Sequence, residues 1–349
     1  MTPVSIEMYE VLSMIGEMVQ ISGEDAGRRK SDPACLERMV LAAKGQSPPY
    51  LLISPVDHSA QDLEALSLMQ GDAFHATRVP GLALLKPDQS LILFGGPGAY
   101  CSEFEDKRAV ILTFKTEESN EVIQTSISQV RAHADLHSVP VVALRIDYDQ
   151  GRARLVAHGA GRAYDVENSL LRSIRRTEPV NQDVLTVLCS DSRIRPPRSK
   201  LGLPMAIRTL GGYVPAYTGQ QDETASLNDF FLSWLSNTPE RRHVVIVAHG
   251  DFDGRGSSCG AGKASLGSES IHNPLLKRVI QMMRDDAGQY EKVLPRSPEG
   301  RVRSIAEATR ANILSYPSVA SMVRECRTPA DFIGTAYMGT VTNVMTEIS

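Results

Sequence analysis

The chain has 349 residues, of which 42% are hydrophobic and 22% are charged, and its formal net charge is -4. This length allows two domains, and the composition is that of an ordinary globular protein. A slightly negative chain gives no electrostatic reason to expect binding to nucleic acid or to an anionic membrane surface. The sequence has no apolar run near the roughly 20 residues that span a bilayer, and its first residues lack the pattern of a secretory signal.

The five cysteines are odd in number and scattered along the chain, which argues against a disulfide framework. Free thiols are typical of a reducing compartment, so we expect a cytoplasmic protein.

The first 45 residues predict helices. Residues 4–20 carry apolar side chains at helical spacing, and residues 33–44 also look helical. Between them, residues 22–32 are polar and contain glycine, which indicates a loop. We expect the first helix to pack on a domain or on a partner subunit, because membrane-surface helices usually carry a basic polar face.

From residue 49 the pattern changes to alternating strands and helices. We expect strands at residues 50–54, 74–78 and 109–114, helices at 62–69 and 121–137, and a hairpin of strands 141–146 and 152–156. This order is typical of an α/β unit with a parallel sheet.

A second series follows, and its strands end in residues that can do chemistry. Residues 184–188 predict a buried parallel strand that leads into Cys189-Ser-Asp191-Ser-Arg193. A thiolate can bind a borderline metal, a carboxylate can accept a hydrogen bond from metal-bound water, and a guanidinium can hold that carboxylate ionised. The pentapeptide alone also fits an ordinary buried cysteine beside a surface ion pair.

Residues 242–249 predict another buried strand, which ends in His249, and a glycine-rich loop then leads to Cys259. In open α/β sheets, ligands bind at the carboxyl ends of the strands. Two strand ends and one loop would therefore bring Cys189, His249 and Cys259 together. Three protein ligands leave one position of a tetrahedral Zn²⁺ open, which is the arrangement of a catalytic zinc site.

These motifs resemble those of the β-class carbonic anhydrases, over about residues 165–349. The stretch from Cys189 to Arg193 matches the first motif of the family without change. Residues 205–211, Met-Ala-Ile-Arg-Thr-Leu-Gly, resemble the strand that normally ends Arg-Asn-Ala-Gly. The family usually has His-x-x-Cys, whereas here nine residues separate His249 from Cys259 and Phe252 takes the nearer position. We interpret this as an insertion that affects substrate access and rate more than metal binding.

The resemblance implies the reversible hydration of carbon dioxide to bicarbonate by a zinc-bound hydroxide, and it implies a homo-oligomer. The zinc ligands that it implies are Cys189, His249 and Cys259, and the catalytic pair is Asp191 and Arg193. Asp191 would accept a hydrogen bond from the zinc hydroxide while Arg193 holds it. Arg208, Gly211 and Gly212 would shape the pocket floor, although the two glycines fit a tight turn equally well.

Two other functions stay open. The same zinc nucleophile could hydrolyse carbonyl sulfide or carbon disulfide, which are small linear molecules like carbon dioxide. The chain could also be a non-catalytic scaffold of the same fold.

The two series can be laid over each other, which indicates internal duplication. A shift of 134 places residues 50–54 on 184–188, and a shift of 130 places residues 75–81 on 205–211. Two unrelated α/β domains with similar strand periods are the alternative. We predict an N-terminal helical segment (1–45), a degenerate copy without a metal site (46–164) and a catalytic zinc copy (165–349).

The first copy lacks the ligands of the second. Pro55 stands at the position of Cys189, Lys115 stands at that of His249, and only Asp57 matches Asp191. We therefore expect one metal site per chain. Since the family works as dimers, we also expect an α/β fold of two parallel-core sheets with flanking helices, in which the two copies form a pseudo-dimer.

Overall fold

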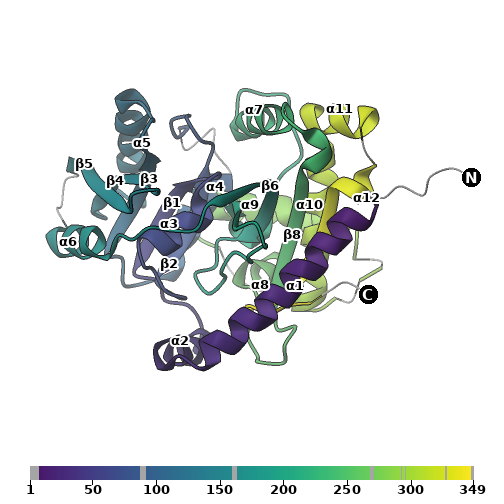
Figure 1. Cartoon of the computed structure of the whole chain (residues 1–349), viewed down its shortest axis with the longest axis horizontal. Coiled ribbons are helices and arrows are strands. Elements are labelled where there is room, and N and C mark those ends of the chain that lie inside the picture. The colour runs from purple at the N-terminus through teal and green to yellow at the C-terminus, as the bar shows by residue number, and fades with distance from the viewer. Residues whose placement is uncertain are drawn as a thin grey trace, which may run out of the picture.

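The structure is a computed structural model that describes residues 8–86, 92–158, 163–267, 271–291, 293–294, 296–326 and 328–346. In this part of the chain, two five-stranded sheets lie side by side with helices around them (Figure 1). Neighbouring strands within each sheet run parallel, apart from the last two strands in chain order, which form an antiparallel pair in each sheet. The predicted α/β architecture with mostly parallel sheets and flanking helices is confirmed.

The first sheet has the strand order β2-β1-β3-β4-β5, and the second has the order β10-β9-β8-β6-β7. The strands of the first sheet are β1 (Tyr50–Pro55), β2 (Ala73–Arg78), β3 (Ala109–Lys115), β4 (Val141–Asp147) and β5 (Arg152–His158). Those of the second are β6 (Val180–Cys189), β7 (Leu203–Thr209), β8 (His243–Gly250), β9 (Ile333–Gly339) and β10 (Met345–Thr346). These strands form where buried apolar runs occur in the sequence.

Helices connect and cover the strands. The first half contains α1 (Met8–Lys30), α2 (Pro33–Lys44), α3 (Ser59–Ala65), α4 (Ile92–Glu103), α5 (Asn120–Ala132) and α6 (Tyr164–Ser173). The second contains α7 (Glu223–Leu235), α8 (Gly260–Ser265), α9 (Pro274–Gly288), α10 (Pro298–Leu314), α11 (Pro317–Glu325), α12 (Pro329–Phe332) and the 3₁₀ turns η1 (Leu210–Gly212) and η2 (Pro239–Arg241). Of the helices in the described ranges, none has the length and apolar character that a bilayer span requires.

Helix α1 is longer than the sequence predicted, and the loop expected at residues 22–32 is wrong. Ser22 and Ala26 are buried, so the polar second half of α1 still packs against the protein. Asp25 and Arg28 form an ion pair one turn apart on this helix. The chain breaks only before α2, where the side chain of Asp32 caps that helix.

Two other helices differ from their predicted bounds. Helix α3 lies at residues 59–65 rather than 62–69, because Ser67 adopts a positive φ of 54° and the N–H of Leu68 closes the helix end on Leu63. Helix α5 ends at Ala132 rather than at residue 137, since His133 leaves the helical conformation.

The two sheets share strand order, strand direction and residue register. Tyr50 pairs with Ala109 in the first sheet, and Val184 pairs with His243 in the second. Each residue of the second pair lies 134 positions after its counterpart, as the sequence comparison predicted. This match supports two tandem copies of one α/β unit.

One part of the predicted alignment is wrong by one residue. In the sheet registers, β2 and β7 correspond at a shift of 131 rather than 130. Thr77 is therefore the counterpart of Arg208, whereas the sequence pattern had matched Arg78 with Arg208. A shared spacing of alanine, arginine and glycine produced the false match, and backbone pairing decides against it.

The two copies meet through an approximate two-fold relationship. The N–H of His75 donates to the carbonyl of Ser190 at 3.0 Å, and the N–H of Ala206 donates to the carbonyl of Val56, also at 3.0 Å. His75 corresponds to Ala206, and Val56 corresponds to Ser190, so the two hydrogen bonds are reciprocal. Such reciprocity defines an isologous contact, and the predicted pseudo-dimer is confirmed in this sense.

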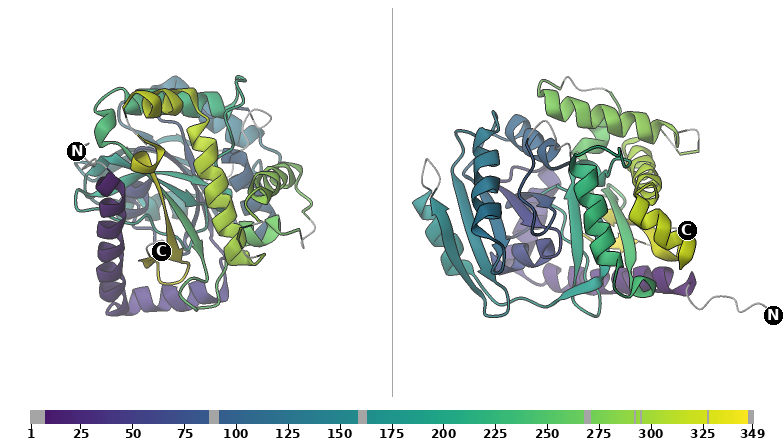
Figure 2. Two further views of the ribbon diagram at one scale, coloured as in Figure 1. Left: turned by 90° about the vertical axis from the view of Figure 1, so that its right-hand side faces the viewer. Right: turned by 90° about the horizontal axis from the view of Figure 1, so that it is seen from above.

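The two copies also exchange helices. Helix α1 precedes the first copy but covers the sheet of the second, and α6 precedes the second copy but covers the sheet of the first. Val11 and Ile15 of α1 pack on the second sheet, and Leu170 of α6 packs on the first. Figure 2 shows α1, in purple, running along the half that contains the green and yellow strands. The exchange of helices buries apolar surface of both sheets within a single chain.

Candidate metal centre

The three residues predicted to bind metal lie together at the carboxyl edge of the second sheet. Cys189 ends β6, His249 is the second-last residue of β8, and Cys259 directly precedes α8. The Sγ atoms of the two cysteines are 3.9 Å apart. The two sulfurs and one ring nitrogen of His249 all lie within 4.8 Å of one another, and all three residues are buried.

The loop between His249 and Cys259 turns back on itself so that the second thiol reaches the first. Gly254 and Gly256 adopt positive φ angles of 68° and 75° in this loop, a conformation that favours glycine. Phe252 packs against Tyr337, with ring centroids 4.9 Å apart. The lengthened spacing that the sequence shows therefore brings Cys259 to the cluster.

His249 is oriented by its second ring nitrogen. Its Nδ1 lies 2.9 Å from Oγ1 of Thr340, and that hydroxyl donates to the carbonyl of Gly250 at 3.1 Å. Because the hydroxyl proton is used, Nδ1 carries a proton and Nε2 keeps a free lone pair. Among the described residues this buried Nε2 has no hydrogen-bond partner, which is what a metal-ligating histidine held by an outer partner requires.

The two thiols lie within hydrogen-bonding distance of each other. Burial raises the pKa of Cys189, whereas the hydrogen bond from Cys189 lowers the pKa of Cys259 and burial opposes that shift. A metal would bind both sulfurs as thiolates and release protons. Two sulfurs and one imidazole are a donor set that suits Zn²⁺ with one position open, so the residues present fit a catalytic zinc ion.

Asp191 and Arg193 form a buried pair beside this cluster. Oδ1 of Asp191 accepts hydrogen bonds from the main-chain N–H and from Nε of Arg193, both at 2.9 Å, and Oδ2 accepts one from Nη2 at 2.6 Å. Burial raises the pKa of Asp191, but the hydrogen bonds and charge of Arg193 outweigh it and hold that pKa below its usual value. Oδ2 also lies 4.0 Å from Nε2 of His249. An ionised carboxylate is therefore fixed next to the candidate ligands.

The guanidinium of Arg193 also fixes the segment that carries Cys259. Its Nη1 donates to Oγ of Ser257 at 2.5 Å, and its Nη2 donates to the carbonyl of Ser258 at 3.3 Å. Arg193 therefore bridges the carboxylate of Asp191 and the loop residues that directly precede Cys259.

Residues of the first half support the motif, and the sequence analysis did not identify them. Nε2 of Gln70 donates to the carbonyls of Arg193 at 2.9 Å and of Val341 at 3.0 Å. The N–H of Gly71 donates to the carbonyl of Ser192 at 2.9 Å. No sequence motif marks Gln70, since its role arises only from the contact between the two copies.

Arg208 and the two following glycines lie beneath the motif. The guanidinium of Arg208 is buried and donates to the carbonyls of Ile194 and Asp191, both at 3.0 Å. Burial lowers the pKa of Arg208 to about 10. Gly211 and Gly212 adopt φ angles of 68° and 67°, which supports their role in a tight turn.

In the first half, a side-chain cation stands at the position that the candidate ligand His249 takes in the second half. Lys115, at the position of His249, lies with its Nζ 3.0 Å from Oδ2 of Asp57, which matches Asp191. Burial opposes the charge, but Asp57 raises the pKa of Lys115 above its usual value. Within the described ranges, the only cluster of three or more potential metal ligands is the one formed by Cys189, His249 and Cys259.

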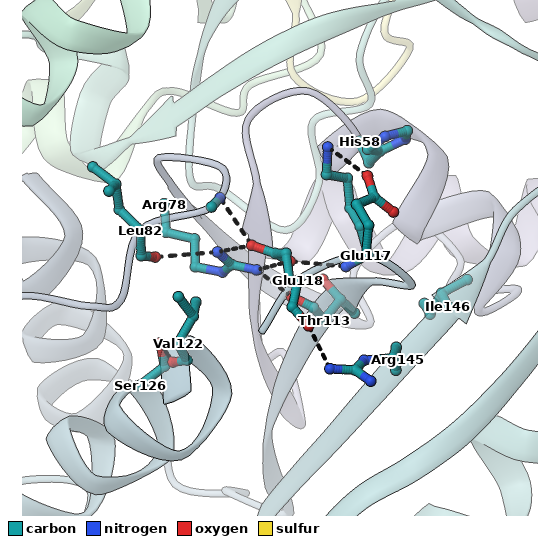
Figure 3. A network of polar contacts seen from close by, with 12 residues as sticks. His58, Arg78, Leu82, Thr113, Glu117, Glu118, Val122, Ser126, Arg145 and Ile146 are labelled. Atoms are coloured by element: carbon teal, nitrogen blue, oxygen red, sulfur yellow. Dashed lines mark hydrogen bonds and ion pairs between the residues drawn. The ribbon is translucent and has the colours of Figure 1, made fainter. Parts of the chain in front are cut away.

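A second ion pair fixes the neighbouring loop of the first half. Figure 3 shows Arg78 facing Glu118, with Nη2 and Oε2 2.6 Å apart and both side chains 2% exposed. Glu118 also accepts hydrogen bonds from the N–H groups of Gly81 and Lys115. The first half is therefore held by internal ion pairs at this sheet edge.

Solved structures similar to this chain include β-carbonic anhydrases. A tetrameric enzyme from Sordaria macrospora is 16% identical, with 48% of this chain and 80% of that chain covered and a TM-score of 0.34. An enzyme from Aspergillus fumigatus is 18% identical, with 50% and 77% covered and a TM-score of 0.34. A Coccomyxa enzyme in complex with acetazolamide is 17% identical, with 50% and 73% covered and a TM-score of 0.35.

No family model and no curated protein matches the sequence. Nothing about the activity of this chain follows from structural similarity at this level.

Proposed function

We propose that this chain catalyses the reversible hydration of carbon dioxide to bicarbonate at a Zn²⁺ ion bound by Cys189, His249 and Cys259. The observation that carries the proposal is the buried group of three ligand atoms within 4.8 Å. It lies beside the carboxylate of Asp191, which Arg193 holds in one orientation. The fold with this Cys-His-Cys group is typical of a zinc site, and the activity is the part that we propose.

When bound, Zn²⁺ supplies Lewis-acid chemistry that makes a nucleophile from water at neutral pH. The residues of the chain position the reactants. Asp191 would accept a hydrogen bond from the reacting water, and Arg193 holds both of its oxygens in one orientation. Thr340 keeps Nε2 of His249 aimed at the metal position. The side chains of Asp191 and Arg193 are 2% and 6% exposed, so little bulk water competes in the site.

Metal analysis and stopped-flow assays of the purified chain test the proposal. We expect one zinc per chain and hydration of carbon dioxide, and we expect Cys189→Ser to lose both. Cys326→Ser is a suitable control, because Cys326 is exposed. Zinc-free wild-type protein would contradict the proposal.

Assays of the same purified chain distinguish carbon dioxide hydration from the two alternative functions, hydrolysis of sulfur analogues and a non-catalytic scaffold. Turnover of carbonyl sulfide or carbon disulfide without turnover of carbon dioxide would replace the proposed substrate. A zinc-loaded chain without activity on any of them would instead favour a scaffold.

We also propose the domain division of residues 1–45, 46–164 and 165–349. The helix exchange between the halves predicts that residues 165–349 alone are unstable, because α1 is then missing from the second sheet. Co-expression of residues 1–164 and 165–349 should restore zinc binding. Zinc binding and activity by 165–349 alone would contradict the proposed dependence on the first half.

We also propose a cytoplasmic location for the protein. All five cysteines are free thiols, which is consistent with the cytoplasm.

We further propose that the chain forms a homo-oligomer. Helix α2 exposes three apolar side chains, which favours self-association: Leu36, Val40 and Leu41 are 42%, 57% and 48% exposed. Light scattering after size exclusion would show an oligomer, and Val40→Ser should weaken it. A monomer at assay concentration would contradict this part.

A further inference from the structure

A charged cleft of about 580 Å³ lies away from the metal centre. Helices α1 and α3, the segment between α6 and β6, and the segment after Arg193 form its walls. Five arginines and three carboxylates line it: Arg28, Arg29, Arg175, Arg195, Arg198, Asp25, Glu64 and Glu178. The cleft is therefore rich in guanidinium groups in a chain whose net charge is negative.

Two of the arginines are already paired with the carboxylates of the cleft. Arg198 contacts Glu64 and lies with Nη1 2.6 Å from Oε1 of Glu178. Arg28 contacts Asp25. These two arginines face three carboxylates and so leave one negative charge, but the five guanidinium groups together give the cleft a net positive charge.

The other three arginines have no carboxylate within ion-pair distance among the described residues. Their guanidinium groups donate only to main-chain carbonyls: Arg29 to Thr342 at 3.0 Å and to Asp25 at 3.3 Å, Arg175 to Glu64 at 2.9 Å, and Arg195 to Leu68. Each guanidinium has five N–H donors, so several of them are left for a ligand.

The charges of Arg29 and Arg175 both act against that of Arg195. Burial lowers the pKa of Arg195 to about 10, and although Asp72 and Glu64 partly offset this, the charges of Arg29 and Arg175 lower it further. Like charges held together in a partly buried cleft destabilise the charged forms. An anion bound between them would relieve that repulsion.

Arg195 is held rigidly in the cleft wall. Pro196 and Pro197 follow it and fix the backbone φ angles. The N–H of Arg195 donates to Oδ1 of Asn343 at 2.7 Å. A guanidinium that is already ordered loses little conformational entropy when it binds a ligand.

We propose that this cleft binds a small organic phosphate through Arg29, Arg175 and Arg195. Planar guanidinium groups bind phosphate oxygens in bidentate fashion. The volume is in the range of small-molecule sites and exceeds what a single phosphate group fills. None of the five residues of the metal centre lines the cleft, so the inference does not depend on the proposed catalytic function.

Calorimetric titration of the zinc-loaded full chain with glycerol 3-phosphate and with inorganic phosphate tests the proposal. We expect saturable binding and a rise in melting temperature with ligand concentration. Arg29→Gln and Arg175→Gln should each weaken binding about tenfold or more, since each removes charge-assisted hydrogen bonds. Arg175 is exposed, so its replacement should leave the fold intact.

Two controls make the result specific. Arg154→Gln removes the same charge from an exposed position on the edge strand β5 and should leave the affinity unchanged. Cys189→Ser should also leave it unchanged, because the anion does not sit on the metal. Absence of binding, equal affinity in the Arg29→Gln and Arg175→Gln variants, or loss of binding in Cys189→Ser would overturn the proposal.

Discussion

Nε2 of Gln70, in the first copy, lies 2.9 Å from the main-chain carbonyl of Arg193, in the second. The same nitrogen donates to the carbonyl of Val341, the residue after Thr340, whose hydroxyl orients His249. One side chain from the copy without metal ligands therefore contacts both segments that position the site of the other copy.

Replacement of Gln70 by alanine should reduce catalysis without loss of metal. The carbonyls of Arg193 and Val341 would lose a buried partner, at a cost of about 1–3 kcal/mol in the free energy of unfolding. We expect kcat for carbon dioxide hydration to fall about tenfold, as for other outer partners of a metal site, while zinc content stays at one per chain.

Gln61→Ala is the matched control. Gln61 is also buried in the first half and donates to a main-chain carbonyl, that of Glu178, away from the metal centre. Gln61→Ala should lower the free energy of unfolding by about as much as Gln70→Ala does, but it should keep the wild-type kcat for carbon dioxide hydration. If both variants keep full activity at equal zinc content, Gln70 has no positioning role.

Thr340→Val should weaken zinc binding. The variant keeps the shape of the side chain but removes the oxygen that accepts the Nδ1 proton of His249. Loss of such an outer partner typically costs 10- to 100-fold in metal affinity, so we expect a decrease of about that size in a chelator competition assay. Thr335→Val, at a buried position of β9, is the control. Equal affinity of the two variants would show that Thr340 does not orient the ligand.

The buried pair of Arg78 and Glu118 should make stability depend on pH. Burial raises the pKa of Glu118, but Arg78 outweighs this, so the folded-state pKa lies below its usual value. A depressed carboxyl pKa adds stability above the unfolded value of about 4.3, and this stability is lost as pH falls through the folded value. Glu118→Gln should lower the free energy of unfolding by about 3 kcal/mol or more at pH 7, and by less below pH 4.

Urea unfolding of the wild type and of Glu118→Gln, at pH 7 and at a pH well below 4, measures how much the free energy of unfolding falls at each pH. Glu117→Gln is the neighbouring control, since the Glu117 side chain is 68% exposed and its pair with Lys115 should contribute less than about 1 kcal/mol. A Glu118→Gln deficit that is the same at pH 7 and at a pH well below 4 would contradict the assigned ionisation.

Lys115→Met tests the assignment of the first copy as a half without a metal site. Removing the cation leaves Asp57 without its lysine partner and with Nε2 of His58 4.0 Å away, and should lower the free energy of unfolding by about 1 kcal/mol at neutral pH. Zinc content should remain one per chain, whereas the equivalent change His249→Met should abolish it. A second zinc in the wild type that disappears in Lys115→Met would refute the assignment.

The sequence predicted the strands and the convergence of Cys189, His249 and Cys259 well, because both follow from local features. Buried strands are continuous apolar runs, and Cys189 and His249 directly follow such runs. Cys259 could be placed because glycines in the preceding loop allow the chain to turn back. These features need no knowledge of tertiary contacts.

Features that depend on contact between the copies could not be predicted. Helix α4 contains glycines and Pro97, which are typical of loops, yet it packs closely between β2 and α9. A Cβ atom on Gly98 would lie 3.1 Å from Oδ1 of Asn273, so the small residue permits this approach. The roles of Gln70 and Thr340 arise in the same way, from residues distant in sequence.

The reciprocal hydrogen bonds of β2 and β7 join two parts of one polypeptide rather than two separate subunits. A dimer dissociates when it is diluted below its dissociation constant, but a tethered partner stays at an effective concentration on the order of millimolar. The segment around Arg193 therefore keeps its supporting neighbour however scarce the protein is in the cell. Loss of the ligands from one copy leaves this support in place, provided that the surface which faces the other copy is preserved.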